Sequence, residues 1–181
     1  MRGLRGSIPI ADVAIVAVAL GAAWMLKAFY SRANVEALQW ILAPTVRLVE
    51  CMNGGAFELE PHLGYLSRAE RFLVAPVCAG VNFLIAAFVS LCVGLLPACR
   101  GPGARVALLL GSAAGAYVTT VLANATRIVL ALRMHATGAS FGPLTPERLH
   151  CALGVAVYFG FMLALFASAS QLAEGRRASW T

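Results

Sequence analysis

Three residues with chemically active side chains lie at the ends of long apolar runs: Cys78, Arg127 and His150. A cysteine thiolate is a strong nucleophile, and a neighbouring cation stabilises it. Histidine titrates near neutral pH, so it can protonate a leaving amine and later deprotonate an acceptor. Arginine is always charged and offers several donors, so Arg127 could stabilise either the thiolate or the oxyanion of a tetrahedral intermediate. Together these residue types indicate acyl transfer at a cysteine.

Each of the three also has an ordinary explanation. A single cysteine in the apolar sequence VCAGVNFL is more often a small packing residue than a nucleophile. Arg127 could extend its charge to a membrane surface, as we expect of Arg133, and His150 could be a polar residue at the same interface. The functional interpretation therefore depends on all three residues lying at one face of a membrane.

The elements that must position these residues are found from the stretches that lack charge. The chain is 60% hydrophobic and only 12% charged, which is typical of an integral membrane protein. Three uncharged runs reach the ~20 residues that a helix needs to cross the hydrocarbon core, and a fourth run, ending near Tyr30, is interrupted only by Asp12 and Lys27 near its ends. We predict an all-α integral membrane protein with a single transmembrane domain over residues 1–181. Its predicted spans are approximately residues 8–30, 73–97, 106–126 and 149–172.

Two further segments are expected between the first and second spans. Residues 35–50 are too interrupted by charge to cross, but their apolar residues recur at helical spacing, which predicts an interfacial amphipathic helix bent at Pro44. From Phe57 to Leu63 apolar and polar residues alternate, which predicts a short extended external segment. Glycine and proline mark the later connections, at Pro97–Gly103 and Gly138–Pro146.

The basic residues predict the orientation. Cytoplasmic loops of membrane proteins are enriched in Lys and Arg, and this chain has three arginine pairs, before the first span, after the second and after the last. These pairs are Arg2 with Arg5, Arg100 with Arg105, and Arg176 with Arg177. We therefore expect a multi-pass protein of the bacterial inner membrane with a cytoplasmic N-terminus. In that topology Cys78, Arg127 and His150 all lie at the outer face.

Polar neighbours strengthen the interpretation. Asn82 follows Cys78 by one helical turn, and Asn124 precedes Arg127 by three residues, so each is expected on the same helix face as its partner. Asparagine inside a membrane needs hydrogen-bond partners and is a functional candidate by default. Gly80 would let the backbone near Cys78 approach a neighbour closely.

Several classes of function are disfavoured. The five cysteines form no C-x-x-C pair, which argues against a zinc ribbon and a thiol–disulfide oxidoreductase. The three histidines show no paired ligand spacing, so we expect no metal site and no cofactor. The net charge of +6 comes from basic residues scattered at helix ends rather than from a stripe, so we expect no nucleic-acid partner.

The ordered motifs resemble those of a known family. The sequence C-A-G-V at Cys78, N-A-T-R-I ending at Ile128, and H-x-x-x-G from His150 to Gly154 resemble the Cys, Arg and His motifs of the exosortase/archaeosortase family. The segments WILAPTVRLVE and VCAGVNFL look most like its short form, exosortase K. The resemblance covers the chain from about Trp40 to Phe161.

The resemblance implies a membrane cysteine transpeptidase. Its substrate would be a membrane-anchored protein that ends in a PEP-like motif, a transmembrane helix and a basic cluster (a PEP-CTERM-like sorting signal). The enzyme would cut near the motif at the outer face and transfer the acyl group to an acceptor. By motif, Cys78 would be the nucleophile, Arg127 the stabilising cation and His150 the acid/base, with Gly154 in a supporting position.

A non-enzymatic function remains open on the same residues. The chain could be a small membrane assembly factor or a permease subunit, in which Arg127 and His150 bind an anionic ligand. Dependence on the Cys78 thiol distinguishes the two hypotheses, because only the enzyme needs a nucleophile. The residues also leave open which motif is cut, which nucleophile accepts the acyl group, and whether the reaction is hydrolysis or transpeptidation.

Overall fold

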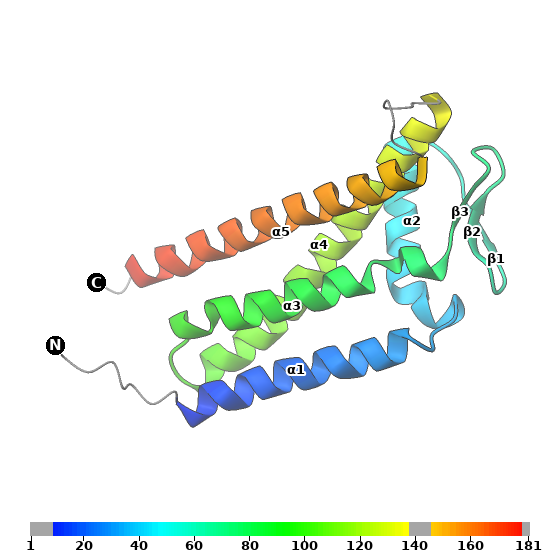
Figure 1. The fold of residues 1–181 in the computed structure, drawn as a ribbon. Helices are drawn as coiled ribbons and strands as arrows, with labels where there is room; N and C mark the ends of the chain where they lie inside the picture. Colours follow the sequence, from blue (N-terminus) through cyan, green and yellow to red (C-terminus); the bar gives the residue numbers. More distant parts are fainter. Residues whose placement is uncertain (1–8, 138–145, 179–181) are drawn as a thin grey trace.

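The computed structural model describes residues 9–137 and 146–178, with side chains for residues 9–135 and 151–171 and for Glu174. Most of the predicted connection over Gly138–Pro146, and the side chain of His150, therefore lie outside the described residues. Four long helices form one bundle (Figure 1), in which α3 packs against each of the other three. They are α1 (Ile10–Tyr30), α3 (Val81–Leu95), α4 (Pro102–Thr137) and α5 (Pro146–Ala178).

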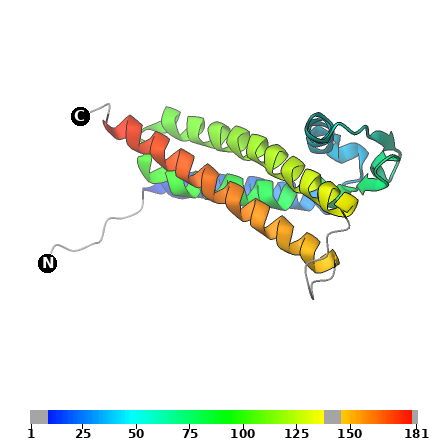
Figure 2. The same ribbon diagram turned by 90° about the horizontal axis from the view of Figure 1, so that it is seen from above.

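The helices alternate in direction, as the prediction of successive spans requires. The start of α1 and the end of α5 lie together at one end of the bundle, while α2 and the three β-strands lie at the other (Figure 2). We call that second end, which holds α2 and the β-sheet, the sheet end. The starts of α3 and α5 and the ends of α1 and α4 all point toward it (Figure 1).

The prediction of four membrane-length apolar helices is confirmed. By length and composition, the described segments that qualify are Ile10–Tyr30, Pro76–Ala98, Pro102–His135 and Cys151–Gln171. The third differs from its predicted limits, because α4 does not end with the uncharged run but continues well beyond Arg127. A single arginine ends a hydrophobic run without ending a helix, since it has good helix propensity and keeps its backbone N–H. With 36 residues, α4 is longer than the ~30 Å hydrocarbon core is thick.

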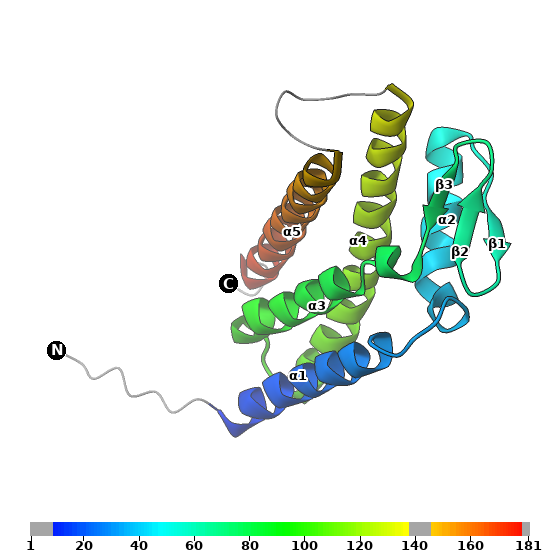
Figure 3. The same cartoon turned by 45° about the vertical axis from the view of Figure 1, so that its right-hand side comes forward.

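The amphipathic segment forms a helix, as predicted. A 3₁₀ turn, η1 (Glu36–Leu38), leads into α2 (Gln39–Asn53), which runs crosswise to α1 and α3 (Figure 3) and contains Pro44 within it. Its apolar face is buried against α4, which the sequence pattern did not predict. The buried residues of that face are Ile41, Leu42, Thr45, Val46 and Val49.

The predicted extended segment is the first strand of a small antiparallel sheet (Figure 3). The strands are β1 (Glu58–Glu60), β2 (Gly64–Ser67) and β3 (Phe72–Val74), in the order β1-β2-β3. Only β1 was predicted, because apolar and polar residues alternate around it, whereas β2 and β3 place apolar residues side by side. Gly64 is required at the start of β2, because it has φ +140° and a Cβ there would lie 2.3 Å from the carbonyl oxygen of Val74.

The core lies between α2, α3 and the second half of α4, at the sheet end. By contrast, the described residues of α1 bury only Ala19 and Ala23. The chain enters α3 through a second 3₁₀ turn, η2 (Pro76–Ala79), and leaves it through a third, η3 (Leu96–Ala98). The turn η2 carries Cys78 and is therefore the element that positions the candidate nucleophile.

Candidate active site

Cys78 lies in a sharp turn whose shape depends on Gly80. The Cys78 backbone N–H donates to the carbonyl of Ala75 at 2.8 Å, and Gly80 then adopts φ +72° before α3 begins. A Cβ on Gly80 would lie 3.3 Å from both Thr120 Cγ2 and Tyr158 Oη. Gly80 thus permits both a left-handed backbone and a close approach of α4 and α5, which confirms the predicted close approach at this residue.

Asn124 connects the Cys78 turn to Arg127. Its side chain is fully buried in α4, and its Nδ2 donates a hydrogen bond to the carbonyl oxygen of Cys78. Its Oδ1 accepts from Arg127 Nε at 3.3 Å and Nη2 at 3.2 Å. The prediction that Asn124 and Arg127 share a helix face is confirmed. One buried amide therefore joins the backbone of the candidate nucleophile to the candidate cation.

Tyr158 belongs to the same site, although it was not predicted from the sequence. Its hydroxyl donates to Asn124 Oδ1 at 3.1 Å, and its ring stacks on Phe83 with centroids 4.8 Å apart. The Arg127 guanidinium carbon lies 5.7 Å from the centre of the Tyr158 ring, within the range of a cation–π interaction. The available signal was a hydroxyl within an apolar span, one helical turn after Gly154. We refer to Cys78, Asn124, Arg127 and Tyr158 as the Asn124 network.

Asn82 does not take part in the Asn124 network through any described hydrogen bond. Its predicted alignment with Cys78 assumed one continuous helix, and that assumption is wrong because the left-handed Gly80 separates η2 from α3. Instead, Asn82 Oδ1 accepts a hydrogen bond of 2.7 Å from Lys27 Nζ on α1. Lys27 also lies 5.5 Å from the centre of the Tyr30 ring. Asn82 therefore holds the end of α1 against the start of α3.

Gly154 and His150 occupy successive turns of α5. Gly154 is buried, and a Cβ built on it would lie 3.5 Å from Arg127 Cδ, so the absence of a side chain lets α5 pack closely against Arg127. His150 lies one turn earlier on the α5 backbone, and its side chain is outside the described residues. The acid/base role of His150 stays a prediction.

The described partners of Arg127 are all neutral. An amide oxygen accepts its hydrogen bonds and a phenol ring lies beside it, so neither cancels its positive charge. In a partly buried site, where the dielectric constant is lower than in water, such a charge acts more strongly on a nearby anion than it would in solution. The described side chains bring together no group of three His, Cys, Asp or Glu residues that could hold a metal ion. The chemistry available here is thus electrostatic stabilisation beside a thiol.

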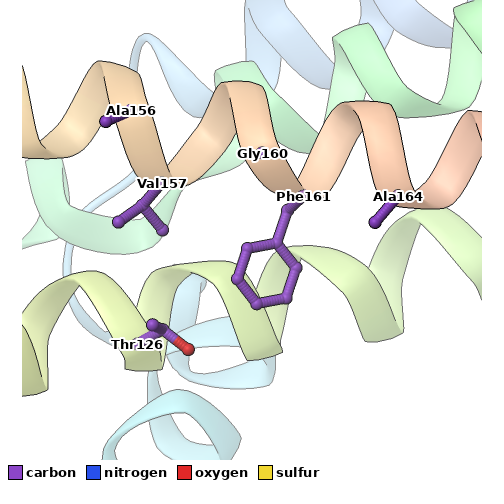
Figure 4. A pocket seen from close by; sticks show the side chains of 6 residues that line it. All are labelled: Thr126, Ala156, Val157, Gly160, Phe161 and Ala164. Carbon is purple, nitrogen blue, oxygen red and sulfur yellow. The ribbon is translucent and has the colours of Figure 1, made fainter.

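An open groove with a volume of about 310 Å³ lies between α4 and α5 (Figure 4). Val157 and the ring of Phe161 extend from α5 toward α4 in this view. The groove is lined almost entirely by apolar atoms, and no residue of the Asn124 network lines it. Its lining residues are Thr126, Ala156, Val157, Gly160, Phe161 and Ala164.

The Asn124 network therefore draws on three separate elements. Cys78 comes from η2, Asn124 and Arg127 come from α4, and Tyr158 comes from α5. Such an arrangement can hold a thiol, a partly buried cation and a phenol in fixed relation to one another. Comparisons of the chain with protein-family models, with curated proteins and with solved structures found no match.

Proposed function

We propose that this chain is a membrane-embedded cysteine protease or transpeptidase of the exosortase kind. Its substrate is a membrane-anchored protein with a C-terminal sorting motif, a transmembrane helix and a basic cluster. The observation that carries the proposal is the link through Asn124, which joins the Cys78 turn to the positively charged Arg127. The buried amide thereby holds the turn that carries Cys78 close to the arginine.

The proposed reaction proceeds through an acyl-enzyme. The Cys78 thiolate attacks the carbonyl carbon of the scissile peptide, and the carbonyl oxygen becomes an oxyanion. Arg127 stabilises either the thiolate before attack or the oxyanion after it. As the C–N bond breaks, His150 protonates the leaving amine, which leaves a thioester on Cys78. An acceptor nucleophile then attacks the thioester while His150 takes its proton, and the Cys78 thiolate leaves.

The decisive experiment compares cysteines within one chain. Cys78→Ala should abolish processing of a substrate that carries the sorting signal. Cys92→Ala is the matched control, because Cys92 is a buried free cysteine of α3 with no place in the network. Cys99→Ala and Cys151→Ala should also process normally. Each variant must accumulate in the membrane like the parent, and normal processing by the Cys78 variant would overturn the covalent mechanism.

Orientation is part of the proposal, because the sorting reaction occurs outside the cytoplasm. The arginine clusters favour a cytoplasmic N-terminus, and in the proposed topology the sheet end is outside with α2 at the outer interface. A periplasmic reporter fused after Gly142, which lies outside the described residues, should be active. The same reporter fused after Gly101 should be silent. The opposite pattern would place Cys78 in the cytoplasm and contradict the proposal.

The neutral surroundings of Arg127 also support a second candidate function. A membrane assembly factor or permease subunit could use the uncancelled charge of Arg127 to bind an anionic ligand. That function requires the arginine but not the thiol. Retained function in Cys78→Ser together with lost function in Arg127→Gln would favour this candidate over the enzyme.

A further inference from the structure

Tyr158 connects α5 to both α3 and α4 at the candidate site. Its ring is stacked on Phe83 of α3 with an interplanar angle of 17° and lies beside the Arg127 guanidinium of α4. Its hydroxyl donates to Asn124 and lies close enough to Gly80 that a Cβ there would be 3.3 Å away. One phenol thus contacts both Asn124 and Arg127 of the network and lies against the turn that carries Cys78.

The hydrogen bonds of this network can run in only one direction. Arginine donates and never accepts, so the atom of Asn124 that faces Arg127 must be the amide oxygen. The amide nitrogen then faces the Cys78 carbonyl, which can only accept. Because the Asn124 oxygen also faces Tyr158, the phenol must donate its proton to it. Both ends of the buried amide are therefore used, and turning it over would break its bonds to the Cys78 carbonyl and to Arg127.

Arg127 has a long side chain with several rotatable bonds, so its charge is useful only where other groups hold it. Electrostatic stabilisation is effective when the donors are already in place before the charge develops. The Asn124 oxygen supplies one constraint on the guanidinium and the face of the Tyr158 ring supplies another. The Tyr158 hydroxyl restrains Asn124 in turn. Removing that hydroxyl leaves the ring in place but loosens the amide.

We propose that Tyr158 and Asn124 are positioning residues that hold the Arg127 guanidinium at the Cys78 turn and thereby raise the reactivity of the Cys78 thiol. The inference rests on the proposed function in one respect, since it assumes that Cys78 is the reactive thiol. It goes further by assigning a task to a phenol and an amide that touch no substrate. It also explains why the amide is buried with both of its ends satisfied.

The test measures the thiol directly, without any substrate. In a chain whose only cysteine is Cys78, the alkylation rate of the thiol by iodoacetamide is followed in membranes across a range of pH. Tyr158→Phe keeps the stacked ring and removes only the hydroxyl. We expect its alkylation rate near neutral pH to fall about tenfold, equivalent to moving the pH profile by about one unit.

A matched control removes a hydroxyl elsewhere on the same helix bundle. Tyr117 of α4 donates to the carbonyl of Trp40 at 2.7 Å and stacks on the Trp40 ring, outside the Asn124 network. Tyr117→Phe should leave the alkylation profile unchanged. If Tyr158 acts through Arg127, adding Tyr158→Phe to an Arg127→Met chain should cause no further loss, because interacting residues show non-additive effects.

A second variant keeps the test decisive if Tyr158→Phe fails to accumulate. Asn124→Asp retains acceptors for Arg127 and Tyr158 but gives Arg127 a carboxylate partner and removes the donor to the Cys78 carbonyl. We expect it to lower the alkylation rate at least as much as Tyr158→Phe. A parental alkylation profile in either variant, or an equal loss from Tyr158→Phe with and without Arg127, would overturn the inference. Normal substrate processing by Cys78→Ala would instead refute the proposed function and leave the alkylation result standing.

Discussion

Helix α4 carries two partly buried arginines whose surroundings differ. Arg105, in the first turn, donates from Nε at 2.9 Å and from Nη2 at 2.7 Å to Asp12 Oδ1 of α1. Arg127, in the second half, donates to the neutral amide of Asn124 and lies beside the Tyr158 ring. A carboxylate cancels the charge that it binds, whereas an amide orients an arginine and leaves its charge available. The first arrangement ties two helices together, and the second can act on a further anion.

The packing is also denser around Arg127 than around Arg105. Near Arg105 the described part of α4 buries few residues, of which Leu108 and Ser112 are the nearest. Around Arg127 the helix meets the main core, with Ile128 and Leu132 almost fully buried. A reactive constellation must be held by residues that cannot move easily, and a dense core provides this support. The charge that stays available is therefore the one in the rigid half of the helix.

Replacing each arginine by lysine should separate the two sites most strongly. Arg127→Lys keeps the charge but loses the planar fork that reaches Asn124 with two nitrogens, so substrate processing should fall on the order of a hundredfold. Arg105→Lys can still pair with Asp12, so its processing per accumulated molecule should match the parent. Quantifying processed substrate against membrane protein gives the comparison. Equal losses in the two variants would show that neither arginine has a special role.

Two glycines with left-handed backbones test whether the Cys78 turn is as constrained as the geometry indicates. Gly80→Ala introduces strain at φ +72° and a Cβ that lies 3.4 Å or less from atoms of Thr120, Tyr158 and Asn124, so it should destabilise the fold by about 2–3 kcal/mol. Gly54→Ala meets open space at φ +74° and should cost only about 1 kcal/mol. Thermal unfolding in detergent measures both. A larger loss for Gly54→Ala would contradict the crowded turn.

Breaking the pair between Asp12 and Arg105 should affect stability and leave the thiol unaffected. Asp12→Asn removes a charged partner from a site where both side chains are mostly buried, and should destabilise the bundle by about 1–2 kcal/mol. The alkylation rate of Cys78 should not change. The double variant Asp12→Ala with Arg105→Ala should lose less stability than the two single variants together. A change in thiol reactivity would mean that the two ends of α4 are coupled.

The smallest effect is expected at an exposed contact of the sheet end. The backbone N–H groups of Glu36 itself and of His62 hold the pKa of the Glu36 carboxyl below its ordinary value of 4.5. Because the Glu36 pKa is lower in the folded protein than in the unfolded chain, the ionised carboxyl stabilises the fold. This stabilisation is complete above the unfolded pKa and is lost as the pH falls through the folded pKa. Glu36→Gln should flatten this acid dependence, measured as protection of the strand segment from proteolysis. An unchanged acid profile would show that the contact contributes nothing.

Helical spacing in the sequence predicted one pair of neighbours in the site correctly and another wrongly. Asn124 and Arg127 were predicted to share a helix face, and they do, because three residues make almost one turn of α4. The same reasoning failed for Cys78 and Asn82, where Gly80 interrupts the helix. An isolated glycine in an apolar run is tolerated in many membrane helices, so the sequence alone did not reveal the break. The left-handed turn became visible only with the backbone.

Local sequence patterns also failed to predict most of the small sheet. The alternation in Phe57–Leu63 was long enough to predict extended backbone, and β1 lies within it. Strands β2 and β3 were missed, because their sequences GYLS and FLV place apolar residues side by side and show no alternation. Their pairing with each other and with β1 decides their structure, and this pairing is a tertiary property.

The sequence by itself determined the four apolar helices, the amphipathic α2 and the relation of Asn124 to Arg127. Each of these follows from composition or from spacing within a few helical turns. The tertiary structure alone decided which helices supply the other partners. Asn124 meets Cys78 across 46 residues, Tyr158 meets Asn124 across 34, and Arg105 meets Asp12 across 93. Periodicity specifies which face of a helix is apolar, but only packing specifies which other helix that face meets.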